Sequence, residues 1–222
     1  MRTAMNAIAL TAAGQSQALA GTVRITASVF AAHYILPPVL AQIRAAEPAI
    51  QIDLIASDDT ENLLFRAADI ALRMYRPTQP DLIARHVTDL QMGTFAATRY
   101  LDRAGRPQSA EDLRHHAVVG FDRNDLMLRL MQQIGWEATR DFFAVRCDDQ
   151  ATYWQLVRAG CGVGFTQTHI GRADPLVEEL DLGLPLPPLP MWLTAHDLMR
   201  RTPRIRRVWD LLFDGLRTRL GP

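Results

Sequence analysis

The first third of the chain alternates between segments that suit buried strands and segments that suit helices, and this alternation constrains the fold most. Strand patterns occupy residues 23–27, 50–56 and 69–73. Residues 37–46 lie between the first two strands and begin with proline, which suits the first turn of a helix. Residues 58–67 begin with helix-capping aspartates and carry apolar side chains at helical spacing. This β-α-β-α-β order predicts a mostly parallel sheet with helices on both faces.

The rest of the chain repeats the alternation, which predicts a second, similar lobe. Further strands are predicted at residues 83–87, 93–97, 118–121, 142–147, 162–166 and 191–196, and further helices at 126–133 and 149–159. Asp148 is the predicted N-cap of the second of these helices, and Gly160 ends it in a left-handed conformation. Pro203 begins a final helix, predicted to return to the first lobe, whose apolar face is formed by Ile205, Val208, Leu212, Leu216 and Leu220.

The predicted fold class is therefore α/β, with two Rossmann-like lobes that contain mixed sheets and are joined by two crossover strands. Lobe I is predicted to comprise residues 21–97 and 191–222, and lobe II residues 98–190. The crossover strands are expected near residues 93–98 and 191–195, which makes the molecule a hinged clamshell with a cleft between its lobes.

Composition limits the classes of protein that fit this chain. A length of 222 residues suits one large domain or two lobes of about 100 residues each. Hydrophobic residues make up 48% and charged residues 22%, as in a globular protein, and the net charge of zero disfavours a free-standing nucleic-acid binder. The two cysteines, Cys147 and Cys161, predict reduced thiols in the cytoplasm rather than a disulfide framework. No apolar run approaches the roughly 18 residues of a membrane span.

Residues 1–20 permit two interpretations. Arg2, an alanine-rich middle and the Ala-Leu-Ala ending resemble a secretory signal. Met1, Met5, Ile8 and Ala12 fall at helical spacing, as in an amphipathic helix, and polar residues interrupt the apolar stretch. The helix is the favoured interpretation.

A series of short motifs follows the same order as in the effector-binding domain of LysR-type transcriptional regulators, which this chain resembles over nearly its whole length. The motifs are Gly-x-Val-Arg-Ile at 21–25, Leu-Pro-Pro at 36–38, Pro-Ala-Ile at 48–50, Asp-Ile-Ala-Leu-Arg at 69–73, Tyr-Leu at 100–101, Glu-Asp-Leu at 111–113 with His116, and Ala-Gly-x-Gly-Val at 159–163. The resemblance implies a fold similar to type II periplasmic binding proteins, with a small effector between the lobes. Residues 1–20 then resemble the end of the family's dimerising linker helix, and the helix at 37–46 its dimer surface.

The chain departs from the family pattern in three places. The DNA-binding winged helix-turn-helix that precedes the linker helix in the family is absent from this sequence. Ala97-Thr98 stands where the family often has Ser-Pro, and Thr166-Gln167-Thr168-His169 replaces a frequent proline. The last two differences leave the identity of the effector open.

The candidate effector site combines residues at strand ends, where ligands collect in α/β folds. Ser28, Val29 and Phe30 follow the first strand, and the Ser28 hydroxyl with nearby N–H groups is expected to hold a carboxylate or another polar group of the effector. Arginines supply charge-assisted hydrogen bonds. The remaining predicted site residues are Arg73, Met74, Thr98, Arg99, Phe121, Phe165 and Thr166, with Thr98 expected to face Thr166.

No catalytic or metal site is predicted, and no cofactor. His115 and His116 are adjacent and lack a third ligand at suitable spacing, and Cys161 has no neighbouring base in a recognisable motif. Glycine-rich phosphate loops and nucleophile elbows are absent from the sequence.

The sequence therefore predicts a non-enzymatic, cytoplasmic regulatory domain that binds a small effector, expected to be a small organic acid. It is expected to form a homodimer or tetramer, to contact DNA only through an N-terminal domain outside this chain, and not to contact a membrane. A secreted solute-binding protein of the same fold is the first alternative, and a lyase on this fold the second.

Overall fold

A computed structural model describes residues 19–58, 68–79, 82–133, 135–196 and 202–221. The chain divides into two compact units, of which unit 1 comprises residues 1–89 and 189–222 and unit 2 residues 90–188. The predicted helix at 58–67 lies almost wholly outside the described residues, as does the predicted helix within residues 1–20.

Unit 1 contains a five-stranded mixed sheet with the order β2-β1-β3-β10-β4. The strands are β1 (Gly21–Ala27), β2 (Ile50–Ala56), β3 (Ile70–Arg73), β4 (Leu82–Leu90) and β10 (Leu189–His196). Strand β1 is parallel to β2 and β3, and β10 is antiparallel to β3. The parallel half follows from the predicted β-α-β-α-β order, whereas the position of β10 is set by long-range pairing.

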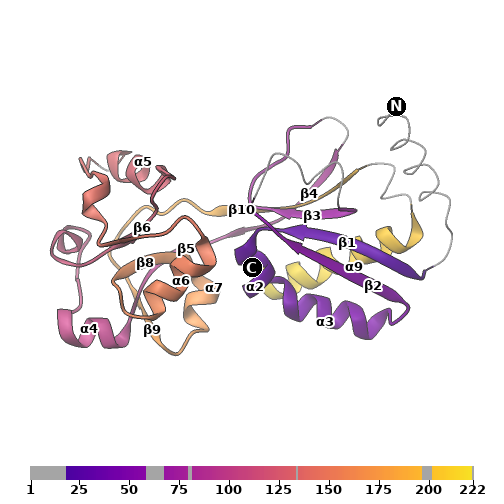
Figure 1. Ribbon diagram of the computed structural model, residues 1–222, viewed down its shortest axis with the longest axis horizontal. Helices are drawn as coiled ribbons and strands as arrows, with labels where there is room; N and C mark the ends of the chain where they lie inside the picture. Colours follow the sequence, from indigo (N-terminus) through magenta and orange to yellow (C-terminus); the bar gives the residue numbers. More distant parts are fainter. Residues whose placement is uncertain (1–18, 59–67, 80–81, 134, 197–201, 222) are drawn as a thin grey trace. The chain divides into compact units, whose positions relative to one another are not determined.

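Three helices lie on one face of this sheet, as Figure 1 shows: α2 (Val29–Tyr34), α3 (Leu36–Ala46) and α9 (Pro203–Leu220). Two prolines in the first turn of α3 and one at the start of α9 fit the helix N-terminus, where their missing N–H groups cost nothing. Helix α9 buries Ile205, Val208, Leu212 and Leu216, as predicted. It packs against α3 and β1, so the C-terminal segment completes the core of unit 1.

The sheets of unit 2 are smaller. Strand β5 (Met92–Ala97) lies between β8 (Val163–Gln167) and β9 (Val177–Leu180) and is antiparallel to both. Strands β6 (Val119–Gly120) and β7 (Val145–Arg146) form a parallel pair, which a parallel bridge from Val118 to Val163 links to β8.

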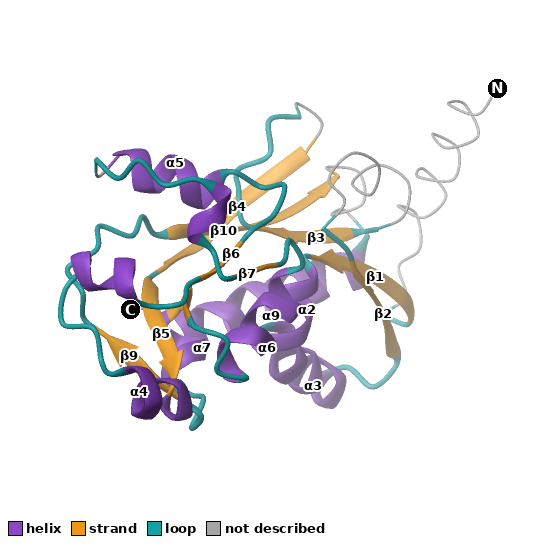
Figure 2. Cartoon of the chain, turned by 60° about the vertical axis from the view of Figure 1, so that its left-hand side comes forward, coloured by secondary structure: helices purple, strands orange, loops and turns teal. Residues whose placement is uncertain are grey.

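The helices of unit 2 are short. They are α4 (Thr98–Ala104), α5 (Leu126–Gln133), α6 (Gln150–Arg158) and α7 (Thr168–Arg172), with 3₁₀ turns η1 (Glu111–His115) and η2 (Arg140–Phe142). Helices α4, α6 and α7 pack against β5 (Figure 2). Positive φ at Gly160, 76°, ends α6 as predicted.

The boundaries of the units differ from the predicted lobe boundaries after Ala97 and before Met191. Strand β5 pairs along nearly its whole length with β8 and β9, so residues 90–97 belong to unit 2. Strand β10 pairs with β3 in unit 1. The chain passes from unit 1 to unit 2 at residues 89–90 and returns at 188–189, so two connections join the units, close to the predicted crossings. Among the described residues, no helix is long and apolar enough to cross a membrane.

Candidate functional site: the carboxyl ends of the strands

The carboxyl ends of β1, β2 and β3 meet at one edge of the sheet in unit 1, because these strands are parallel. Ser28 follows β1 and is the N-cap of α2, where its Oγ accepts a hydrogen bond from the Ala31 N–H at 3.3 Å. The Val29 N–H donates to Asp58 Oδ1 at 3.1 Å. Ser28 and Val29 thus have internal hydrogen-bond partners, although a hydroxyl that accepts one bond can still donate another. Their predicted contact with an effector stays a prediction.

Phe30 belongs to the core of unit 1. It is buried in α2, and its ring lies 4.7 Å from that of Tyr34. Met74 follows β3 at the edge itself and is half-buried. Phe30 and Met74 are both predicted site residues because each follows the end of a strand closely. The turn into α2 points Phe30 into the core, so only Met74 lies at the edge.

Arg73 is the most unusual residue at this edge, because its side chain is only 4% exposed. Its Nη1 donates to the Leu72 carbonyl at 3.2 Å and its Nη2 to Thr26 Oγ1 at 3.3 Å, while its buried Nε has no partner in the described ranges. No ion pair joins it to a carboxylate among the residues that the structure describes. Burial lowers the pKa of Arg73 below its usual value, which the Tyr75 hydroxyl and the Asp58 carboxylate partly offset.

The face of the sheet around Arg73 is polar. Arg73 lies directly opposite Trp192 on β10, and Thr194 lies opposite Ala71. Because directly paired residues share a face of a sheet, Arg73, Trp192 and Thr194 project from the same side. Trp192 Nε1 and Thr194 Oγ1 are also buried, and neither has a partner among residues 19–58, 68–79, 82–133, 135–196 and 202–221. Three unpaired hydrogen-bonding atoms therefore lie on one face of two adjacent strands.

A second edge of this kind occurs in unit 2. Strands β6, β7 and β8 run parallel, so residues that follow each of them share an edge. Phe121 lies there and packs on Tyr153, with ring centroids 5.3 Å apart. Phe165 is half-buried, and Thr166 is buried next to Gln167. Phe121 thus lies at this edge, whereas Phe165 and Thr166 lie within β8 itself.

The prediction that Thr98 faces Thr166 is wrong. In the antiparallel pairing of β5 and β8, Thr166 lies opposite Gly93, five residues before Thr98. At about 3.3 Å per residue, this separates the two threonines by about 17 Å along the strands. Thr98 begins α4 at the opposite end of the sheet.

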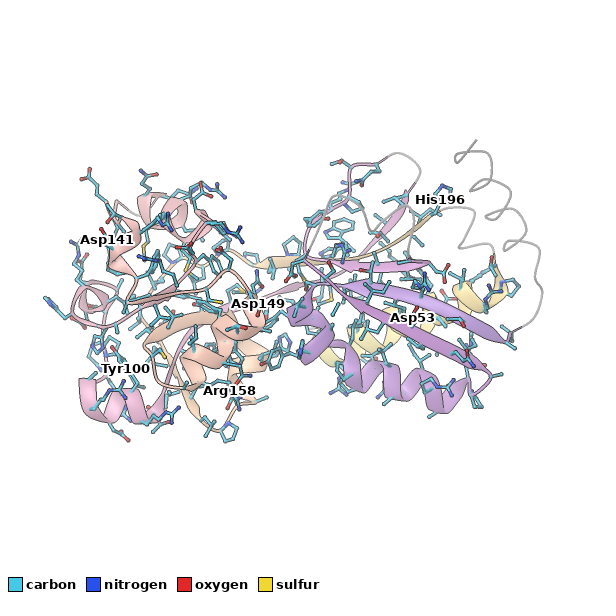
Figure 3. The ribbon with its side chains drawn as sticks, viewed as in Figure 1. Asp53, Tyr100, Asp141, Asp149, Arg158 and His196 are labelled. Atoms are coloured by element: carbon cyan, nitrogen blue, oxygen red, sulfur yellow. The ribbon has the colours of Figure 1, made fainter. Side chains whose placement is uncertain are left out.

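Arg99 also has a structural role. Its Nη2 donates to the Arg158 carbonyl at 3.3 Å, and Arg103 Nη2 donates to the Gly160 carbonyl at 2.6 Å. Two arginines of α4 thereby satisfy carbonyls at the C-terminus of α6, where positive charge is favourable. Arg158, which Figure 3 labels, forms an ion pair with Asp174. These contacts occupy the Arg99 guanidinium away from the strand ends where a ligand is expected.

Asp149, and not Asp148 as predicted, is the residue that caps α6. Asp149, labelled in Figure 3, is the N-cap of α6 and accepts from the Thr152 N–H. Asp148 instead accepts from the backbone N–H groups of Asp122, Arg123 and Asn124, at 2.9 to 3.2 Å. Although desolvation favours the neutral acid, these donors and the Arg123 side chain lower its pKa to about 2. Asp148 thus holds the loop that follows β6 in place by accepting three consecutive backbone N–H groups.

Replacing this carboxylate is expected to destabilise unit 2 in a pH-dependent way. Asp148→Asn presents an amide to three N–H donors and should cost about 1–2 kcal/mol of unfolding free energy at pH 7 for this partly exposed group. Since the folded pKa is lowered, the carboxylate stabilises the protein above its unfolded pKa near 4, and this contribution is lost as the pH falls towards 2. Urea titrations at several pH values should show the two proteins converging below pH 4. An equal gap at pH 7 and pH 3 would contradict this role.

His116 belongs to the packing of unit 2, since its Nδ1 lies 3.1 Å from the Tyr100 hydroxyl. Within the described ranges, no three His, Cys, Asp or Glu side chains cluster in a way that could hold a metal ion. The predicted ligand position between two lobes stays a prediction.

The LysR substrate binding domain family matches residues 16–217. The chain belongs to this family. The HTH-type transcriptional regulator CrgA of Neisseria meningitidis (serogroup C) is 34% identical over 101 residues, which cover 46% of this chain and 34% of CrgA. An HTH-type transcriptional repressor of Pseudomonas aeruginosa is 30% identical over 180 residues, covering 78% of this chain and 54% of the repressor.

Solved structures agree on the fold of the LysR domain. The CrgA regulatory domain superposes with a TM-score of 0.75 at 22% identity, covering 91% of this chain and 100% of that one. The AmpR effector-binding domain from Citrobacter freundii gives a TM-score of 0.70 at 18% identity, covering 89% and 99%. These domains have the type II periplasmic-binding-protein-like fold, as predicted. The chain spans about a third to a half of the length of the curated relatives it matches.

Proposed function

We propose that this LysR domain senses a small organic acid at the strand-end edge of unit 1 and controls DNA binding by a larger regulator. The observation that carries the proposal is Arg73, a buried guanidinium without a carboxylate partner among the described residues. Burying a charge without a counter-ion is costly, and a ligand carboxylate would offset that cost. A guanidinium fork also matches the geometry of a carboxylate.

Arg73 alone does not account for useful affinity. Charge-assisted hydrogen bonds contribute about 1.5–3 kcal/mol, whereas micromolar binding requires about 8 kcal/mol. Apolar burial must supply much of the difference, and half-buried Met74 is available for it at the same edge. The rest of the acid therefore determines specificity, while Arg73 selects its charge.

The regulatory step is a shift in population. An effector that binds one arrangement of the regulator more tightly favours it by no more than the difference in affinity. The curated relatives are named as HTH-type regulators, so we propose that DNA binding occurs through a segment of that type and that the regulator acts in the cytoplasm without catalysis. These relatives do not favour a secreted solute-binding protein or a lyase.

Oligomerisation through α3 forms part of the same proposal. Leu36, Val39 and Ile43 of α3 are buried within unit 1. The opposite side of the helix exposes small residues, Ala41 and Ala45. Small side chains on an exposed helix face allow close approach of a second copy, which supports a homodimer or an assembly of dimers.

Arg73→Gln is the direct test of the anion anchor. A panel of small mono- and dicarboxylates is screened by thermal shift, and hits are titrated calorimetrically. The variant should bind a hit at least about 30-fold more weakly, because the charge-assisted hydrogen bonds are lost. Its melting temperature should not fall markedly, since an unpaired buried charge is removed.

Arg24→Gln is the matched control, because Arg24 is an exposed arginine of the same sheet that pairs with Asp53, which Figure 3 labels. It should leave acid binding unchanged. In the whole regulator, the acid should alter operator binding for the wild type and for Arg24→Gln but not for Arg73→Gln. An acid that binds wild type and Arg73→Gln equally would exclude Arg73 as the anchor.

A further inference from the structure

We infer that Trp192 and Thr194 are specificity-determining residues that bind a second acceptor oxygen of the effector, beside the carboxylate held by Arg73. The chemical class of the effector is then a 2-oxo or 2-hydroxy carboxylic acid rather than a plain carboxylic acid. This inference rests on the proposed function and names the effector class for the same site.

The register of the sheet places the three side chains together. Arg73 Nη2 reaches Thr26 Oγ1, and Thr26 lies opposite Ala71 on β3. The guanidinium therefore extends back over the small side chain of Ala71. Thr194 lies opposite Ala71 on the other side, on β10. Thr26 and Thr194 therefore lie on either side of Ala71, on the face of the sheet from which Arg73 projects.

The burial of these atoms requires a partner. Thr194 is fully buried and Arg73 is 4% exposed, and neither Thr194 Oγ1 nor Arg73 Nε has a hydrogen-bond partner within the part of the chain that the structure describes. An unsatisfied buried polar group costs free energy, so native proteins pair nearly all of them with protein, water or ligand. Three such atoms on adjacent positions of β3 and β10 indicate a site that binds something polar.

The donor set specifies the chemistry of that ligand. Arg73 Nε and Trp192 Nε1 can only donate hydrogen bonds, and the Thr194 hydroxyl can donate one. The complement is a group with several acceptor oxygens close together. A carboxylate next to a carbonyl or hydroxyl oxygen provides three, whereas a plain carboxylate provides two.

Trp192 is held in place at this site and also reaches solvent. The His86 ring lies 5.0 Å from the indole in an edge-on arrangement, and the Arg76 guanidinium lies 5.5 Å from its centroid. These two contacts pack the indole against β4 and the segment that follows β3. Trp192 is only half-buried, so it separates the buried polar atoms from the surface.

The test compares matched acids that differ only in the second oxygen: butanoate with 2-oxobutanoate, and phenylacetate with phenylglyoxylate. Calorimetric titrations use the wild type, Thr194→Val, which removes the hydroxyl at constant shape, and Trp192→Phe, which removes the N–H. Thr194→Ser is the control that keeps the hydroxyl. The 2-oxo acid should bind the wild type about three- to tenfold more tightly than its plain partner, as expected for one added hydrogen bond.

Thr194→Val and Trp192→Phe should each remove most of this preference and leave the plain acid within about twofold, while Thr194→Ser should keep it. Both acids of a pair could instead bind through Arg73 with equal affinity, unchanged in Thr194→Val and Trp192→Phe. Ordered water would then fill the site, so this inference would fail while the proposed function would stand. If no acid of either kind binds the wild type, both fail. Should Trp192→Phe not fold, Thr194→Val alone decides the result.

Discussion

Gly162→Ala is expected to unfold unit 2 at conditions under which the wild type is stable. A Cβ at Gly162 would lie 2.4 Å from the Ala117 carbonyl oxygen, and φ at this position is +156°. The obstacle is backbone and cannot rotate away. The same carbonyl accepts the Val163 N–H at 2.8 Å, next to the Val118–Val163 bridge that links β6 to β8. Overpacking together with loss of this bond should cost about 3 kcal/mol.

Hydrogen exchange resolved by residue gives the measurement. Exchange should accelerate in β6, β7 and β8 of Gly162→Ala and remain near wild type in β1 and β3, because the two units have separate cores. Gly183→Ala is the control: Gly183 also has positive φ, 64°, but nothing lies within 4 Å of a Cβ there. It should cost only about 1 kcal/mol, from backbone strain. Equal effects of the two variants would refute the steric argument.

Trp209→Ala should cause a comparable or larger loss in unit 1. Trp209 lies on α9, is 1% exposed and is among the largest fully buried side chains of the protein. Truncating a buried tryptophan to alanine costs about 3–5 kcal/mol, because transfer free energy is lost and a cavity remains. Helix α9 contacts both α3 and β1, so the loss should loosen the whole unit.

Urea denaturation followed by hydrogen exchange measures this effect. In Trp209→Ala, amide protection against exchange should be lost in β1, α3 and α9 of unit 1. In Gly162→Ala it should be lost in unit 2 instead. Arg206→Ala serves as the matched control, because Arg206 is an exposed residue on the same helix and alanine is a good helix former. Its unfolding free energy should stay within about 0.5 kcal/mol of wild type. Loss of protection confined to α9 would show that the helix is not needed by the sheet.

The parts of the fold that were predictable have strong local signals. Strands β1, β2 and β3 combine β-branched and apolar residues with flanking turn residues, and α9 repeats apolar residues at helical spacing over five turns. Helices α2, α4 and α7 were missed because they have only five to seven residues, too few for periodicity to show. Strand β9 (VEEL) was missed because its glutamates suit exposed positions more than a strand.

A residue of the candidate site was predictable only where its position followed from the sequence immediately around it. Arg73 follows a predicted strand, and its place at the strand end follows from that strand alone. The expectation that Thr98 faces Thr166 failed because the direction of β5 relative to β8 depends on pairing between segments some 70 residues apart. Trp192 and Thr194 carried no signal, since only the pairing of β10 with β3 brings them beside Arg73. Antiparallel and parallel neighbours cannot be distinguished from either strand by itself.

The discontinuity of unit 1 has a consequence for synthesis on the ribosome. Strand β10 occupies the place between β3 and β4, yet about a hundred residues of unit 2 are made before it. While those residues emerge, β3 has an open edge and the core lacks α9. Unit 2 is contiguous and can fold first, whereas unit 1 must wait for the end of translation. Nascent chains halted before Leu189 should therefore present a chaperone with the unpaired edge of β3, and released chains should not.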